Sequence, residues 1–175
     1  MATGYVDVPH STYAEWKANT LGNAYNLDGA YGCQCWDYAS LFWRNVGFPA
    51  GYPLTSSNLS AYEIWTEQKI ANAGNVFTLI YNKEDVKTGD IIVFNYDSGN
   101  PYGHIGFANE DYNGTNTISV LGQNQGGTPQ PEGGENVSVN NLNLGLFLGA
   151  FRYPAWHEPV PPTPVTATNS HFKWV

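Results

Sequence analysis

Residues 34–46 read QCWDYASLFWRNV, and this stretch decides how the rest of the chain is arranged. Counted from the cysteine, its apolar side chains recur at i, i+3, i+4, i+7, i+8 and i+11, the spacing of one face of an α-helix. The members of this face are Cys35, Tyr38, Ala39, Phe42, Trp43 and Val46. Gly47 and Pro49 then end the helix. The sequence therefore predicts a well-buried helix whose first residue is a cysteine.

Two further helices and a series of strands surround this helix. Ser11 can cap a helix from Thr12 to Asn19, and a short helix is expected from Leu59 to Lys69. From residue 76 onward, β-type segments alternate with turns rich in Gly, Asn, Asp and Pro. Helices followed by strands indicate an α+β domain whose helices pack on one face of an antiparallel sheet of about six strands. The predicted strands are Val76–Ile80, Asp90–Phe94, His104–Ala108, Thr117–Leu121, Asn136–Val139 and Gly145–Arg152.

Length and charge narrow the possible functions. The chain has 175 residues, which is room for one sizeable core, and its 7 basic and 15 acidic residues give a net charge of −8. Such acidity argues against a nucleic-acid partner, whose phosphates require basic patches. No apolar run of about 18 residues is present, so no membrane span is expected. The segment from Met1 to Lys17 also lacks the apolar core of a signal peptide, which predicts synthesis in a cytoplasm.

A proline-rich segment follows the predicted domain. Five of the 11 prolines fall between Pro154 and Pro164, so residues 157–168 are expected to form an extended, semi-rigid linker. The domain then occupies residues 1–156, and residues 169–175 form a tail too short to fold alone. We interpret this tail as the start of a further domain, with an ordinary frayed terminus as the alternative.

The predicted chemistry centres on a thiol. Cys35 stands at the first turn of its helix, where backbone N–H groups and the helix dipole stabilise a thiolate. His104, between Gly103 and Gly106 on a predicted strand, can supply the base. Taken alone, Cys35 could be a small core hydrophobe and His104 a structural histidine. Cys33 precedes the helix and is expected to be a free, uninvolved thiol, because a disulfide across C-x-C is strained.

Two polar residues complete the predicted catalytic set. The side-chain amide of Gln34 could join the Cys35 N–H in an oxyanion hole. Asn124, at the end of the strand that follows His104, is a candidate to orient the imidazole ring. The alternative for Asn124 is a turn residue, since its loop is rich in Gly, Gln and Asn.

Oxygen-bearing groups alternate just ahead of the cysteine. Side chains of Asn26 and Asp28, backbone carbonyls of Ala30 and Gly32, and the carboxylate of Asp37 make a set suited to a hard cation. The same composition is typical of an ordinary loop, and the spacing alone leaves that alternative open.

Five segments, in this order, resemble a known family. Tyr31-Gly32-Cys33-Gln34-Cys35-Trp36-Asp37 is similar to the "YG-x-QC-x-D" signature of CHAP domains, the cysteine, histidine-dependent amidohydrolase/peptidases of phage endolysins and bacterial autolysins. Val86–Phe94, Tyr102–Gly106 and Gly122–Asn124 match further motifs of the family, and Gly149–Pro154 resembles its last strand. The resemblance covers roughly residues 8–155.

This resemblance implies a papain-like α+β fold and hydrolysis of an amide or peptide bond in the peptidoglycan of Gram-positive bacteria. Cys35 would be the nucleophile, His104 the general base and Asn124 the polar residue that follows. Many members carry a glutamate two residues before that asparagine, where this chain has Gly122. If that glutamate normally steers the histidine, Asn124 or a neighbour such as Glu110 must do so here.

The resemblance also favours Ca²⁺ at the loop formed by Asn26, Asp28, Ala30, Gly32 and Asp37, because several CHAP endolysins bind calcium with this pattern. It implies a phage enzyme that acts on the cell wall after release from the host cytoplasm. The acidic charge and the proline-rich linker predict a separate C-terminal wall-binding module that supplies affinity for the wall, and we expect a monomer. The alternatives are a host autolysin of the same fold and a non-catalytic, calcium-dependent wall- or glycan-binding module.

Overall fold

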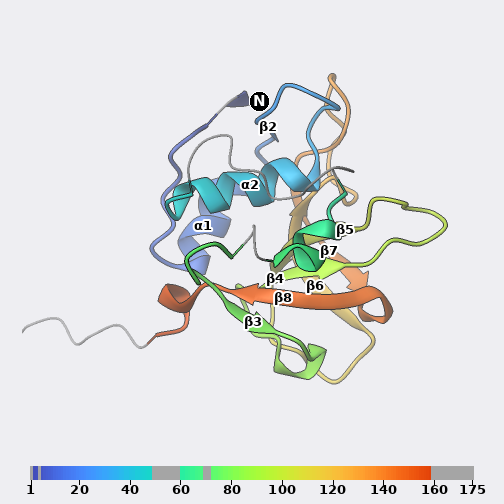
Figure 1. The fold of residues 1–175 in the computed structure, drawn as a ribbon. Helices are drawn as coiled ribbons and strands as arrows, with labels where there is room; N and C mark the ends of the chain where they lie inside the picture. Colours follow the sequence, from blue (N-terminus) through green and yellow to red (C-terminus); the bar gives the residue numbers. More distant parts are fainter. Residues whose placement is uncertain (1, 4, 49–59, 69–71, 159–175) are drawn as a thin grey trace, which may run out of the picture.

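The computed structural model describes residues 2–3, 5–48, 60–68 and 72–158. Its α-helices are α1 (Tyr13–Thr20), α2 (Cys35–Asn45) and α3 (Glu63–Thr66). A six-stranded sheet has the order β3-β8-β4-β5-β6-β7, with every pair antiparallel (Figure 1). Its strands are β3 (Thr78–Ile80), β4 (Ile91–Phe94), β5 (His104–Ala108), β6 (Thr117–Gln123), β7 (Val137–Asn143) and β8 (Phe147–Arg152). The α+β prediction is confirmed.

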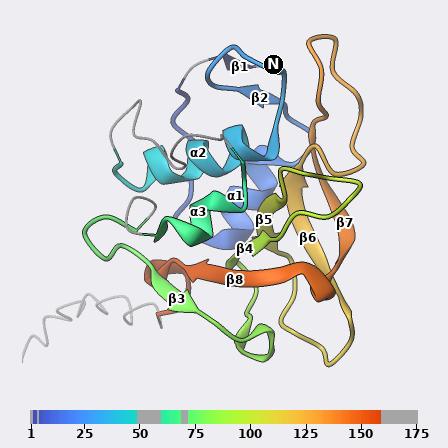
Figure 2. The same cartoon turned by 45° about the vertical axis from the view of Figure 1, so that its right-hand side comes forward.

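A short parallel pair lies apart from this sheet. Strand β1 (Ala2–Thr3) pairs with β2 (Tyr25–Asn26), which leads into the loop before α2. The loop that joins β6 to β7 also reaches this region, because the Cys33 N–H donates to the Gly133 carbonyl at 2.9 Å. Figure 2 shows that loop rising beside the N-terminal end of α2. The segment in front of the cysteine is therefore held from two sides.

Helix α1 and its cap each begin one residue later than predicted. The hydroxyl of Thr12 accepts a hydrogen bond from the Glu15 N–H at 3.1 Å, so Thr12 is the N-cap residue. The Ser11 hydroxyl instead donates to the Glu15 carboxylate. The prediction that Ser11 caps this helix is wrong by one position, because Thr12 has the extended backbone that an N-cap requires.

The helices and the sheet enclose one aromatic core. Trp16 from α1, Tyr38 and Phe42 from α2, and Phe107 from β5 are fully buried. Their rings lie 5.1–5.8 Å apart, and each side chain of this size contributes roughly 1.5–3 kcal/mol on burial. Figures 1 and 2 show α1 and α2 on the same side of the sheet. The apolar face predicted for residues 35–46 is thus the face that anchors α2.

Some element ends differ from their predicted positions. Within the described residues α3 covers only Glu63–Thr66, while Leu59 and Lys69 lie outside them. Strand β7 runs to Asn143 rather than to Val139, because its Asn-rich second half keeps pairing with β6 as far as Thr117↔Asn143. A 3-10 turn, Leu144–Leu146, then precedes β8, so this strand starts at Phe147.

The folded contacts continue past the predicted end of the domain. Trp156 donates its indole N–H to the His10 carbonyl at 2.8 Å, and His157 Nε2 lies 3.4 Å from the Asp90 carboxylate. The Glu158 N–H donates to the Pro154 carbonyl. The remainder of the predicted linker, residues 159–168, and the tail, residues 169–175, lie outside the described residues. In the described part of the chain, none of the helices has the length and apolarity needed to cross a membrane.

Candidate active site

Cys35 is the first residue of α2, and its thiol lies against β5. The backbone N–H of Ile105, the residue after His104, interacts with the thiol and favours the thiolate. Burial has the larger effect and raises the pKa of Cys35 to about 11. Both cysteines are free, as predicted, and Cys33 is completely buried. The structure therefore places the thiol next to the strand that starts with His104.

Asp37 holds the backbone around the thiol in place. One of its carboxylate oxygens accepts the Leu27 N–H at 2.8 Å, and the other accepts the Gln34 N–H at 3.0 Å. These bonds join the loop in front of the cysteine to the first turn of α2, where backbone N–H groups otherwise lack partners. Burial raises the pKa of Asp37 to about 6, although both hydrogen bonds act in the opposite direction.

The side chain of Gln34 is fixed at both ends. Its Nε2 donates to the Tyr31 carbonyl at 2.6 Å, and its Oε1 accepts from Asn124 Nδ2 at 2.7 Å. This corrects the prediction that Asn124 meets the imidazole, because its amide points to the glutamine beside the nucleophile. The backbone explains the difference: Asn124 has φ 59°, a left-handed conformation that turns the chain at the end of β6.

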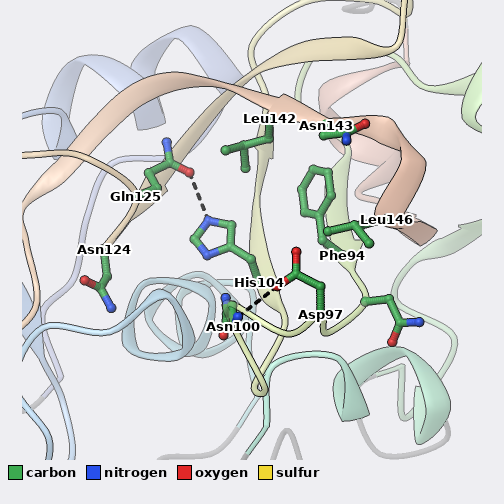
Figure 3. A pocket seen from close by; sticks show the side chains of 10 residues that line it. Phe94, Asp97, Asn100, His104, Asn124, Gln125, Leu142, Asn143 and Leu146 are labelled. Atoms are coloured by element: carbon green, nitrogen blue, oxygen red, sulfur yellow. Dashed lines mark hydrogen bonds between the residues drawn. The ribbon is translucent and has the colours of Figure 1, made fainter.

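The side chain that contacts the His104 imidazole is Gln125, the residue after Asn124. Its Oε1 lies 2.9 Å from His104 Nε2 (Figure 3). The Nε2 group of Gln125 donates to the carbonyls of Val120 and Ser138 at 2.7 and 3.0 Å. Burial lowers the pKa of His104, while the bond from Gln125 raises it. Glu110, the other candidate orienter, instead accepts the Ser119 N–H at 2.9 Å.

Two glycines leave room for this arrangement. Gly103 has φ 67°, and a Cβ there would lie 2.5 Å from the Phe94 carbonyl, so β5 can start only with glycine before the histidine. A Cβ on Gly122 would lie 2.5 Å from Gln125 Oε1 and 3.3 Å from His104 Nε2. The side chain of Gln125 therefore occupies the space into which a larger residue at position 122 would project.

Gln123 joins the histidine side of the site to the cysteine side. It is completely buried, and its Nε2 donates to the carbonyls of Tyr25 and Gln34 at 2.7 and 2.8 Å. Its Oε1 accepts the Tyr25 N–H at 2.9 Å. Three consecutive amides at the end of β6 thus hold β2, the Gln34 side chain and the imidazole. Sequence reasoning missed Gln123 and Gln125, although the run Gln123-Asn124-Gln125 is visible in the sequence.

A cavity of about 230 Å³ opens beside the imidazole (Figure 3). His104, Asn124 and Gln125 form part of its wall, and Asp97 is the charged residue on the opposite part. Polar amides and apolar side chains line the rest of this cavity: Phe94, Asn95, Asn100, Leu142, Asn143 and Leu146. Such a hollow with a few polar groups is the usual form of a ligand site.

The predicted metal loop contains an unpaired oxygen. Asn26 is 5% exposed, and its Oδ1 has no hydrogen-bond partner. Asp28 lies near Asp37, since its charge raises the pKa of that carboxyl. The Asp28 carboxylate also accepts the Ala30 N–H at 2.8 Å. Gly29, Tyr31 and Gly32 have positive φ angles of 73°, 60° and 76°, which curve the loop in front of the cysteine.

Comparisons with known proteins identify relatives of this chain. A Streptococcus phage B30 protein named D-alanyl-L-alanine endopeptidase is 34% identical over 163 residues, 91% of this chain. The chain spans only 34% of the length of that relative. Among solved structures, the wild-type endolysin LysIME-EF1 superposes with a TM-score of 0.57 at 24% identity, over 81% of this chain and 62% of that chain. That likeness supports the fold.

The family match covers the proposed nucleophile and base together. Residues 22–124 match the family described as CHAP domain, so the matched segment runs from the loop before Cys35 through His104 to Asn124. This segment makes up more than half of the 175 residues. The chain therefore belongs to the CHAP domain family.

Proposed function

We propose that this chain is the catalytic domain of a peptidoglycan hydrolase, which cleaves an amide or peptide bond with Cys35 as nucleophile and His104 as base. The placement of the Cys35 thiol against the N–H of the residue that follows His104 is the observation that carries this proposal. The name of the phage relative supports an amide bond of peptidoglycan as the target. The cavity beside His104 supplies room for part of a substrate.

The proposed reaction follows the chemistry of thiol hydrolases. Cys35 Sγ attacks the carbonyl carbon of the substrate while His104 takes the thiol proton, and a tetrahedral oxyanion forms. The Cys35 N–H at the start of α2 and the free N–H of Gln34 Nε2 are the donors available to that oxyanion. The imidazolium of His104 then protonates the leaving amine. Water, deprotonated by His104, finally hydrolyses the thioester and restores the thiol.

A paired substitution tests the nucleophile. Purified Gram-positive peptidoglycan is incubated with the unmutated chain, with Cys35→Ala and with Cys33→Ala, and soluble fragments are analysed by mass spectrometry. We expect fragments from the unmutated chain and from Cys33→Ala, and none from Cys35→Ala. The new termini distinguish a muramoyl–alanine amidase from an endopeptidase. Equal release by Cys35→Ala would overturn the mechanism, and no release from several wall types by the unmutated chain would favour a binding module.

We also propose that the loop before Cys35 binds Ca²⁺. The side-chain oxygens of Asn26, Asp28 and Asp37 and the carbonyls of Ala30 and Gly32 would hold the ion. The buried, unpaired Oδ1 of Asn26 supports this assignment, because such an oxygen is destabilising unless a donor or a cation meets it. Among the described residues, no hydrogen-bond donor meets the Ala30 or Gly32 carbonyl. The ion would brace the loop that Asp37 joins to α2.

The remaining proposals concern the full-length protein. The domain carries a net charge of −8, which gives no attraction to an anionic wall. We therefore propose a separate wall-binding module after the proline-rich segment, in a monomeric phage endolysin released from the host cytoplasm. The short coverage of the phage relative is consistent with such a further part. Lysis of whole cells by this domain alone, equal to that of the full-length protein, would contradict the proposal.

A further inference from the structure

We propose that Gln125 is the positioning residue of His104, and that its amide replaces the carboxylate expected at position 122 by entering the space that Gly122 leaves open. This proposal rests on the proposed hydrolase function. It assigns the role to a neutral side chain, on a residue that lies outside the matched family segment of residues 22–124.

The hydrogen bonds of Gln125 determine how its amide is turned. The amide nitrogen lies 2.7 Å from the Val120 carbonyl and 3.0 Å from the Ser138 carbonyl. A flipped amide would place Oε1, which cannot donate, against these two acceptors. Only the orientation with Oε1 towards His104 lets the amide donate to both carbonyls.

The fixed amide in turn selects one form of the imidazole. Because Oε1 can only accept, His104 Nε2 must carry a proton and donate it across the 2.9 Å contact. In the neutral ring the other nitrogen, Nδ1, is then unprotonated. Nδ1 is therefore the atom that takes the thiol proton and later gives it to the leaving amine. Gln125 thus supplies both the tautomer and the ring orientation that a general base needs.

The contact between Gln125 and His104 also depends on Gly122. A methyl group at position 122 would lie 2.5 Å from Gln125 Oε1 and 2.9 Å from its Cδ, closer than unbonded atoms approach. The amide would have to move away from His104 Nε2, which lies 3.3 Å from the same point. A glycine at position 122 and a glutamine at position 125 are therefore required together.

The two positions can be tested in a double-mutant cycle. The variants are Gln125→Leu, Gly122→Ala and the two combined, with Gln130→Leu as control because that glutamine lies in the β6–β7 loop and donates to the Thr128 carbonyl. With soluble peptidoglycan fragments as substrate, we expect Gln125→Leu and Gly122→Ala each to lower kcat about 10- to 100-fold with little change in KM. The combined variant should be no slower than Gln125→Leu alone. The control should keep the original kcat.

A second measurement, by NMR, determines the tautomer of His104 independently of enzyme activity. In protein labelled with ¹⁵N-histidine, the ring signals of His104 are identified by their loss in His104→Asn. We expect the neutral ring to carry its proton on Nε2 in the unmutated chain and to show a mixture of tautomers in Gln125→Leu and Gly122→Ala. Circular dichroism at the assay temperature establishes that each variant is folded.

The outcomes separate this proposal from the proposed function. A proton on Nδ1 in the unmutated chain would overturn the role of Gln125. An unchanged tautomer and unchanged kcat in both variants would also overturn it. If the unmutated chain releases nothing from peptidoglycan, the hydrolase function fails, whereas the tautomer result still decides whether Gln125 positions His104.

Discussion

Asn124 donates a hydrogen bond from Nδ2 to Oε1 of Gln34 at 2.7 Å and so ties the end of β6 to the residue before the nucleophile. The Tyr31 carbonyl accepts from the other end of the same glutamine amide at 2.6 Å. The proposed oxyanion donor is therefore held by two partners from different segments. Such preorganisation is what makes a donor effective when charge develops on the substrate.

Removing the hydrogen bond between Asn124 and Gln34 should slow the reaction. Asn124→Gly permits the left-handed backbone at φ 59° and deletes the side chain with its amide, so the Gln34 side chain loses one of its two partners. We expect kcat to fall about 10-fold, which corresponds to roughly 1.4 kcal/mol, with little effect on KM. In the matched cycle, Asn124→Gly should add nothing to Gln34→Ala. Additive losses would indicate that Asn124 acts by another route.

The pH dependence should report His104. Burial lowers its pKa below the usual 6.5, and the bond from Gln125 raises it in part. As pH rises through this pKa the ring becomes neutral and can accept the thiol proton, so kcat/KM should rise along an acid limb centred below pH 6.5. Because Gln125→Leu removes the bond that raises the pKa, the limb should move to lower pH.

Two other titratable groups lie near the imidazole, and Asp97 provides a control. Asp97 stands on the wall of the cavity, and the pKa of Cys35 is raised to about 11. Asp97→Asn should leave the limb in place, because the burial and the Gln125 bond that shift the pKa of His104 remain. If the acid limb of the kcat/KM profile shifts in Asp97→Asn and stays in place in Gln125→Leu, its assignment to His104 is contradicted.

The sequence predicted the parts of the site that follow from periodicity. Cys35 begins a helix because apolar residues recur along 34–46, and His104 begins a strand whose Ile105 and Phe107 alternate into the core. The role of Gln125 could not be predicted in this way. Asn124 adopts φ 59°, so three consecutive amides leave the chain in different directions. Which of them meets the imidazole depends on a turn that no hydrophobic pattern encodes.

Element ends were predictable only where the pattern was apolar. The second half of β7 is rich in asparagine, which is typical of turns. It nevertheless pairs with β6, because backbone hydrogen bonds do not depend on the polarity of the side chains. The cap of α1 shows the same limit. Ser11 and Thr12 are both good caps by residue type, and only the backbone conformation decides between them.

Calcium should stabilise the domain through the loop that contains Asn26. At a Ca²⁺ concentration about 100 times the Kd, the gain is about 2.7 kcal/mol. For a chain of this size each kcal/mol raises Tm by about 2–4 °C. Asn26→Leu removes the buried, unpaired Oδ1 and keeps the number and branching of the side-chain heavy atoms, so it should abolish this gain and leave Tm in chelator unchanged or higher. Differential scanning calorimetry with Ca²⁺ and with EDTA measures both effects.

The same calorimetry can also contradict the proposed Ca²⁺ site. An equal Tm in Ca²⁺ and EDTA for the unmutated chain would remove the proposed site. Equal calcium gains in the unmutated chain and in Asn26→Leu would place any bound ion elsewhere. Mg²⁺ serves as the matched ion, and it should stabilise less because it prefers a smaller octahedral set of oxygens.

The largest loss of stability should come from a buried carboxylate that does not line the cavity. Asp90 is completely buried, accepts from Arg152 Nε and Nη2 at 2.8 and 2.7 Å, and also accepts the Lys87 N–H at 2.8 Å. Asp90→Asn leaves the guanidinium without its buried counter-charge, so we expect unfolding to become easier by about 3 kcal/mol. Lys87→Gln is the matched control, because it breaks the exposed pair with Asp111 and should change stability by less than about 1 kcal/mol. Urea denaturation of the two variants measures the difference, and equal losses would show that the Asp90–Arg152 pair has no special role in joining β8 to the start of β4.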